Sequence, residues 1–286
     1  MTWFLIVISI LILFHLIVIL TYNFVINPYE PSIFTKIFPY MFIYNLTFSK
    51  VKLQNPYFSI RVDINTSREN VKKHNEGVLE LIELANKYTI PITFSISTEY
   101  LPYITSDVIK GIKDGNHEVI SHGAKHKKIT SQYQIKSIKK SKKKLEDKFD
   151  QKVIGLIGPQ GEHDSKTLKA ARLNDLKYIS SGTLSLLRYW SFPYPFEKGG
   201  IWLLGGSIKS DYQLYEKDKL KSNKALEVWK EAIGFRTKKG WYTQLEYHNS
   251  STTKEKLNSL EDLFRYIKSL EELKPVTQSE LIKEVS

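Results

Sequence analysis

The chain has 286 residues, a formal net charge of +12 and 42% apolar residues. It contains no cysteine, which excludes a disulfide framework and a thiolate site. Beyond the N-terminal region about 230 residues remain, which is ample for the core of one α/β barrel or of two smaller domains.

The N-terminal segment predicts a membrane anchor. Residues 3–22 carry no charge and would form a helix about 30 Å long, which matches the hydrocarbon core of a bilayer. Trp3 and Tyr22 stand at its ends like interfacial anchors, and His15 interrupts the apolar run. No charged n-region precedes the run and no small-x-small site follows it, so we expect a retained anchor over residues 1–25 rather than a cleaved signal peptide.

The region after the anchor carries the evidence on orientation. Lys36, Lys50 and Lys52 follow the anchor and nothing basic precedes it, which by itself favours a cytoplasmic body. The motifs of the folded part favour the outer face instead, and we expect the folded part to be extracytoplasmic. Residues 26–54 are rich in proline and aromatic residues and predict a juxtamembrane linker or a membrane-hugging segment. The folded domain then spans residues 55–286.

A strand followed by a helix recurs along the folded domain. Residues 57–65 alternate and are rich in β-formers, and residues 71–88 repeat apolar side chains at helical spacing. Further strands are predicted at 90–97, 118–121, 153–157, 177–180, 200–204 and 242–247, and further helices at 98–115, 135–149, 164–174 and 257–270. Repeated βα units predict a parallel sheet, and their number favours an α/β fold closed into a distorted barrel of about seven strands.

The helix at 135–149 holds much of the positive charge. Its apolar residues predict one buried face, so its lysines are most simply a solvated face. Attraction to anionic lipid or to an anionic wall polymer is the alternative. The sequence shows neither a base-stacking platform nor a nucleic-acid-binding motif, so we expect no nucleic-acid partner.

Polar residues follow several of the predicted strands. Asp63 and Asn65 end the first strand, His122 and His126 follow the third, and His248 follows the last. Each could have a purely structural role, for instance as a helix cap or a surface histidine. In a closed parallel barrel, however, these strand ends meet at one rim, where barrel enzymes place their active sites. Two histidines four residues apart can also bind a borderline metal such as zinc.

The motifs, in this order and spacing, resemble the polysaccharide deacetylases, which form the NodB-homology group or carbohydrate esterase family four. The resemblance covers residues 57–286 and rests on FSIRVDINTS, EGVLELIELANKYTIPITFSIS, NHEVISHGAKH, IGPQGEHDSKTLKAARLNDLKYISS and LEYH. The first and third of these segments are especially similar to the branch that includes deformylases of lipid-linked amino sugars, so that branch stays an alternative.

The resemblance implies a role for each motif. It places the general base at Asp63, metal ligands at His122 and His126, an oxyanion-holding main-chain N–H at Gln160, and the acid for the departing amine at His248. It also implies a divalent metal, with zinc first and cobalt, nickel or manganese as alternatives. Amide hydrolysis needs these parts: an activated water, a Lewis acid and a proton for the amine.

Two positions depart from the family pattern. The metal-binding aspartate is Asn65 here, and the arginine that steadies the base is Ile157. An asparagine oxygen can coordinate a metal but brings no charge. The third ligand could therefore be Asn65 through its oxygen, Asp63 shifted onto the metal, or a side chain of Glu162 or His163.

The sequence thus predicts a membrane-anchored, metal-dependent hydrolase. Its substrate would be an N-acyl group, chiefly acetyl, on an amino sugar of an envelope polysaccharide or a lipid-linked glycan. The alternatives are a catalytically impaired carbohydrate-binding relative, a deformylase of a lipid-linked amino sugar, and a hydrolase of a small amide.

Overall fold

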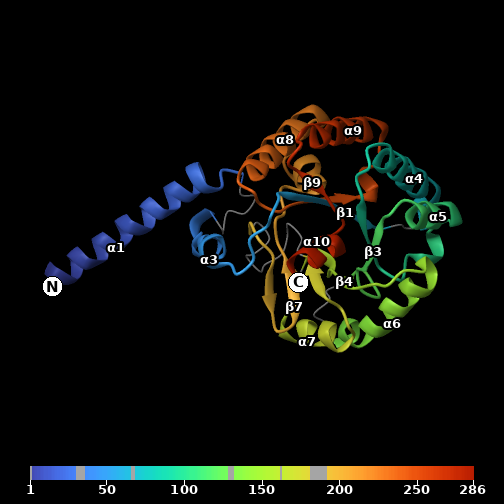
Figure 1. The fold of residues 1–286 in the computed structure, drawn as a ribbon, viewed down its shortest axis with the longest axis horizontal. Helices are drawn as coiled ribbons and strands as arrows, with labels where there is room; N and C mark the ends of the chain where they lie inside the picture. Colours follow the sequence, from blue (N-terminus) through green and yellow to red (C-terminus); the bar gives the residue numbers. More distant parts are fainter. Residues whose placement is uncertain (1, 30–35, 66–67, 128–131, 162, 181–191) are drawn as a thin grey trace.

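The computed structural model describes residues 2–29, 36–65, 68–127, 132–161, 163–180 and 192–286. Within them, the parallel strands form a ring (Figure 1). In ring order the strands are β1 (Tyr57–Ile64), β2 (Ile92–Ile96), β3 (Glu118–Ser121), β4 (Gly155–Leu156), β5 (Tyr178–Ser180), β7 (Ile201–Leu204) and β8 (Thr243–His248). Two short strands are added at the edges: β6 (Phe196–Lys198), antiparallel to β7, and β9 (Lys274–Pro275), beside β1. The predicted barrel of about seven strands is confirmed.

The ring closes between β8 and the segment that follows β7. The amide of Gln244 donates to the carbonyl of Gly206 at 2.8 Å, and the amide of Ile208 donates to the carbonyl of Gln244 at 3.0 Å. Gly206 has a φ of +81°, and a Cβ there would lie 2.7 Å from the carbonyl oxygen of Tyr242. Only glycine fits such a conformation and such a close approach, so the closing point of the barrel depends on it.

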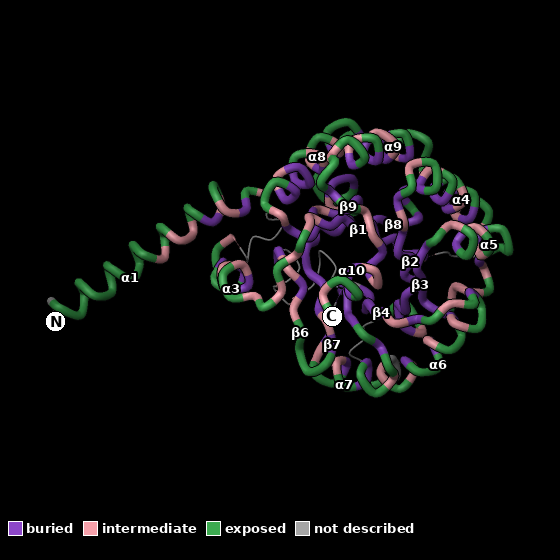
Figure 2. Tube along the Cα trace, in the orientation of Figure 1, coloured by how far each residue is buried: buried purple, intermediate pink, exposed green. Residues whose placement is uncertain are grey.

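Helices surround the sheet, and their buried faces point towards it (Figure 2). They are α4 (Val71–Lys87), α5 (Ser106–Asp114), α6 (Gln132–Phe149), α7 (Ser165–Leu173), α8 (Ser222–Lys238) and α9 (Lys254–Ser269). The last helix, α10 (Gln278–Val285), lies over one end of the ring, near the C-terminus (Figure 1). Short turns complete the chain: η2 (Arg68–Asn70), η3 (Leu101–Tyr103), η4 (Pro159–Gly161), η5 (Tyr212–Lys217) and η6 (Asn249–Ser251).

The sequence patterns predict most of these elements. On α6, Ile138, Leu145 and Phe149 are fully buried, and most lysines of the helix are exposed, so the solvated lysine face is confirmed. The single helix expected over 98–115 is instead the turn η3 followed by the shorter α5. Asp164 caps α7 with its side chain through a capping box, as its position before the helix predicts.

The N-terminal region leaves the side of the ring (Figure 1). Helix α1 (Thr2–Thr21) continues into the π-helical turn η1 (Tyr22–Ile26), and the stretch Trp3–Ile26 is long and apolar enough to cross a membrane. A signal sequence would pass the same test of length and composition. Within residues 26–54, the helix α3 (Tyr40–Phe48) packs Phe42 onto the barrel.

Candidate functional site

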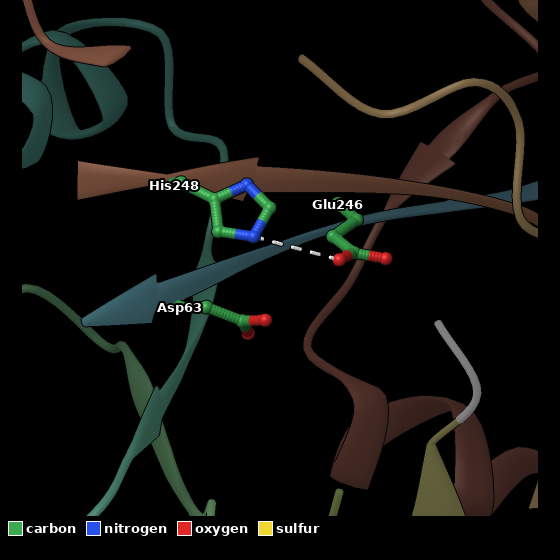
Figure 3. A group of neighbouring side chains, drawn as sticks. All are labelled: Asp63, Glu246 and His248. Carbon is green, nitrogen blue, oxygen red and sulfur yellow. Dashed lines mark ion pairs between the residues drawn. The ribbon is translucent and has the colours of Figure 1, made fainter. Parts of the chain in front are cut away.

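The ends of β1 and β8 form one wall of the rim. The two strands are parallel neighbours, and their register places Asp63 beside His248 and Arg61 beside Glu246. Because side chains two residues apart on a strand point to the same face, all four point into the barrel. Figure 3 shows Asp63, Glu246 and His248 gathered around one space at the end of these strands. The predicted rim is therefore formed here by two pairs of facing residues on the neighbouring strands β1 and β8.

Arg61 ties this wall together. Its Nε donates to Asp63 Oδ1 at 2.9 Å, and its Nη2 lies 3.1 Å from Glu246 Oε2. Nη1 donates to the hydroxyl of Ser180 at 3.1 Å, and the arginine side chain is wholly buried. Burial would raise the pKa of Asp63, but Arg61, with smaller contributions from His122 and His248, holds it below its usual range. Asp63 is therefore ionised at neutral pH.

His248 carries the opposite charge. Its Nδ1 lies 2.7 Å from Oδ1 of the buried Asp211, and its main-chain N–H donates to Asp211 Oδ2 at 3.0 Å. Its Nε2 lies 3.6 Å from Glu246 Oε1. Burial would lower the pKa of His248, but Asp211 and, to a smaller extent, Glu246 and Asp63 raise it to about 10. The imidazole is thus protonated at neutral pH and can give up a proton.

The second wall is the loop after β3. His122 is buried directly after the strand, and His126 is exposed, with the two ring centroids 5.2 Å apart. The main chain of His122 is fixed by its N–H to the carbonyl of Ile96 at 3.0 Å and by its carbonyl to the hydroxyl of Ser97 at 3.0 Å. Burial lowers the pKa of His122 to about 4, although Asp63 opposes that effect. The ring is neutral at pH 7, which is the form that binds metals.

Two potential ligand atoms at the rim are buried and have no hydrogen-bond partner among the described residues. They are Nδ1 of His122 and Oδ1 of Asn65, the residue that follows β1. The main chain of Asn65 is held by its N–H to Oδ1 of Asn249 at 3.1 Å. A buried polar atom without a partner is costly. Both atoms are of a kind that binds a divalent cation, so the side chains present fit the metal that the resemblance implies.

Another group at the rim also has the composition of a metal site. Asp63, Glu246 and His248 each offer a ligand atom, and these atoms all lie within 4.8 Å of one another. However, Glu246 is paired with Arg61, and His248 is protonated by its contact with Asp211. These two residues are therefore already engaged by ion pairs within the protein. The neutral histidine of the second wall is better suited to bind a cation.

The motif that contains Gln160 begins directly after β4 and continues into the turn η4 (Pro159–Gly161). This places Gln160 at the same end of the sheet as the other predicted site residues.

Ile157 is buried in an apolar cluster with Ile120 and Tyr178. Of the two alternative ligands, Glu162 lies outside the described residues. Burial lowers the pKa of His163 to about 4, with smaller effects from the main chain of Gly161 and from Lys198 and Asp164.

Three residues that shape this site are not among those predicted from the sequence: Arg61, Glu246 and Asp211. The strand alternation contains a signal for the first, because Arg61 is two residues before Asp63 and must point the same way. Arg61 supplies, from β1, the guanidinium that position 157 lacks. Glu246 is likewise two residues before His248. Asp211 stands outside any strand, just before η5, and no periodic pattern indicates it.

Comparisons with known proteins concern the barrel. The family model described as polysaccharide deacetylase matches residues 59–179, which run from β1 to β5 and leave Asp211, Glu246 and His248 outside the match. No curated protein sequence matches the chain. A Mycobacterium smegmatis protein described as a polysaccharide deacetylase is similar in structure, with 17% sequence identity and a TM-score of 0.67. That similarity covers 83% of this chain and 92% of the other.

Two further solved structures share the fold. The Puue allantoinase is 14% identical, with a TM-score of 0.67 over 80% of this chain and 89% of its own. A pseudoenzyme of the CE4 family from Bacillus anthracis is 16% identical, with a TM-score of 0.52 over 81% of this chain and 66% of its own. Identities this low establish the fold alone. The family match shows that residues 59–179 of this barrel are similar to the polysaccharide deacetylases.

Proposed function

We propose that this protein is a membrane-anchored, metal-dependent hydrolase that removes an N-acyl group from an amino sugar. The observation that carries the proposal is the pair formed by Asp63 and His248. Neighbouring strands place an ionised carboxylate beside a protonated imidazole at the rim, next to the two unpartnered atoms of Asn65 and His122. One group that accepts a proton and one that donates a proton are what amide hydrolysis requires.

The side chains at the rim divide the chemistry between them. Asn65, His122 and His126 would hold a divalent cation, which supplies Lewis acidity at the acyl oxygen and makes water more acidic. Asp63 takes the proton from the attacking water, and Arg61 fixes the orientation of its carboxylate.

The other half of the site completes the bond cleavage. His248 gives its proton to the departing amine, while Asp211 holds the ring in place. The main-chain N–H of Gln160 donates to the oxygen on which negative charge develops.

The substrate we propose is an N-acetylated amino sugar of an envelope polysaccharide or a lipid-linked glycan. An N-terminal helix able to span a membrane supports a location beside such glycans, with the barrel on the extracytoplasmic face. An N-formyl group on a lipid-linked amino sugar fits the same machinery, because the carbonyl and the amine are the same.

A second candidate function is carbohydrate binding without turnover. Asn65 favours it, since a neutral ligand in place of a carboxylate weakens a metal site. One protein of this fold is described as a pseudoenzyme, and a mutant of it as having restored enzymatic activity. Loss of activity is therefore compatible with this barrel.

The deciding experiment is release of acetate or formate from a panel of N-acylated glycans. The full chain is assayed in detergent or liposomes, with and without a chelator, beside Asp63→Asn and a control, Asp107→Asn, which alters an exposed carboxylate on α5. We expect release that the chelator and Asp63→Asn abolish and that Asp107→Asn leaves unchanged. Binding of a glycan without release of any acid would instead support the carbohydrate-binding alternative.

A further inference from the structure

Residues 36–40 lie along the N-terminal helix, from near its C-terminal end back to its middle. The Nδ1 of His15 shares a hydrogen bond with the hydroxyl of Tyr40, and the two rings stack with their centroids 5.4 Å apart. The ring of Phe38 is 6.0 Å from the same histidine. Nearer the end of the helix, the side-chain amide of Asn23 donates to the carbonyl of Lys36 at 3.0 Å. Residues 36–40 therefore lie back along α1, although Tyr29 has already contacted Phe235 of α8, with ring centroids 5.5 Å apart.

The position of His15 sets the depth of this contact. The candidate span Trp3–Ile26 has 24 residues, of which Tyr22 near its end is buried, and His15 stands near its midpoint. Residues that touch His15 must share its depth if α1 crosses a bilayer. The returning stretch suits that environment, because residues 37–49 contain no charged side chain. The hydroxyl of Tyr40 also gives His15 the polar partner that an imidazole inside a membrane requires.

Helix α3 has two apolar faces, and only one of them is covered by the protein. On the covered face, the ring of Phe42 lies 5.2 Å from Tyr22 and 5.4 Å from Trp241 of the barrel. The open face carries Met41, Tyr44 and Phe48, which are 58%, 63% and 67% exposed. Their spacing of three and four residues puts them on one side of the helix. A large apolar stripe open to solvent indicates a surface that binds something.

We propose that α3 is a second membrane element, embedded beside α1 in the same leaflet through the stripe Met41, Tyr44 and Phe48. This rests on the proposed anchoring by α1. The stripe adjoins the apolar helix α1, and this identifies the lipid bilayer as the partner that the stripe binds. Lys36 and Lys50, at the ends of the uncharged stretch, can extend their ammonium groups to the headgroups.

The consequence concerns the substrate. The barrel is joined to α3 by Phe42 and by Oδ1 of Asn45, which accepts the main-chain N–H of Tyr194 at 3.2 Å. The barrel is therefore held against the bilayer, without a free linker between them. The rim then works at a fixed height, which suits an amino sugar carried at the membrane surface.

The test uses single cysteines, since the chain has none of its own. In liposomes, the full chain carries an environment-sensitive fluorophore at Tyr44→Cys or Phe48→Cys. Leu11→Cys on α1 is the lipid reference, and Leu173→Cys on α7, which is 71% exposed, is the water reference. We expect the labels at 44 and 48 to be quenched by quenchers attached to lipid chains, as at 11. Aqueous iodide should quench only the label at 173.

The other outcomes overturn the inference in distinguishable ways. If the label at 11 is in lipid while those at 44 and 48 behave like the label at 173, α3 lies in water and anchoring stands. If all four labels are open to iodide, the anchoring fails and α3 fails with it. If the labels at 44 and 48 are shielded from both quenchers, the stripe binds protein, for instance a second copy of the chain. Deacylation, measured separately, bears on the catalytic proposal alone.

Discussion

The two walls of the rim differ in how their polar atoms are satisfied. On the β1 and β8 wall, Arg61 pairs with Asp63 and Glu246, and His248 pairs with Asp211. On the wall formed by the loop after β3, the buried Nδ1 of His122 has no partner among the described residues. The first wall is held in place by the protein itself. The second needs something from outside the chain.

The first wall is organised by ion pairs within the protein, whereas the second is open to a ligand. In the proposed function, ion pairs fix the base and the acid before any ligand arrives, so their geometry costs nothing at the moment of reaction. The metal side is left neutral, because protonated histidines cannot bind a cation. We therefore expect changes on the two walls to have different effects: loss of acid–base function or stability on the first, and loss of metal binding on the second.

The largest effect should follow from removal of the acid. His248→Gln removes the group that protonates the leaving amine, and we expect kcat to fall about 10²- to 10⁴-fold. Asp211→Asn should act through His248, because Asp211 is the main cause of its pKa of about 10. The acid is active below its pKa and inactive above it, so the alkaline limb of the kcat profile should move to lower pH in Asp211→Asn. An unchanged limb would show that another group donates the proton.

Removal of the buried Arg61 guanidinium should have the next largest effect, which is a loss of stability. Arg61→Met removes the buried guanidinium that pairs with Asp63 and Glu246, and breaking such a buried pair costs about 3–5 kcal/mol. Chemical denaturation of the variant beside Arg265→Met measures this cost. Arg265 bonds Asp262 at the surface, so its loss should have little effect. Equal stability of the two variants would mean that Arg61 does not hold this wall together.

A charged ligand at position 65 tests the second wall. Asn65→Asp adds a carboxylate beside the neutral histidines, and we expect the metal to bind about tenfold more tightly or better. The titration of the metal is followed together with acid release. A parallel rise in turnover would identify the natural chain as an impaired enzyme. Loss of existing turnover would instead identify Asn65 as a working ligand.

The smallest effect concerns a neutral histidine at the start of β3. Burial lowers the pKa of His117 to about 4, and its Nδ1 accepts the main-chain N–H of Ile92 at 3.1 Å. The unfolded histidine binds its proton near pH 6.5, so stability is complete above that pH and falls as the pH drops towards 4. Between pH 7 and 5.5 the loss should be about 1 kcal/mol. His117→Asn keeps an acceptor and should remove this loss in denaturation curves; an identical pH dependence would contradict the assignment.

The sequence predicts the strands better than it predicts the site. Alternation over 57–65 and the polar residues at strand ends locate the rim, because a period of two fixes which side chains point inward. The pair Arg61 and Glu246 depends on the register of β1 against β8, which are far apart in the chain. Local patterns carry no information on such register. Helix α3 was missed as a helix because its apolar residues surround it, and half of them face away from the barrel.

Metal content provides the most direct test of a shared ion at this rim. The full chain and the variants His122→Ala, His126→Ala and Leu173→Ala are loaded with zinc, dialysed, and analysed for metal by elemental analysis. We expect one ion per chain in the natural protein and in Leu173→Ala, and a clear loss in both histidine variants. Retention of the ion by both histidine variants would show that the second wall does not hold the metal.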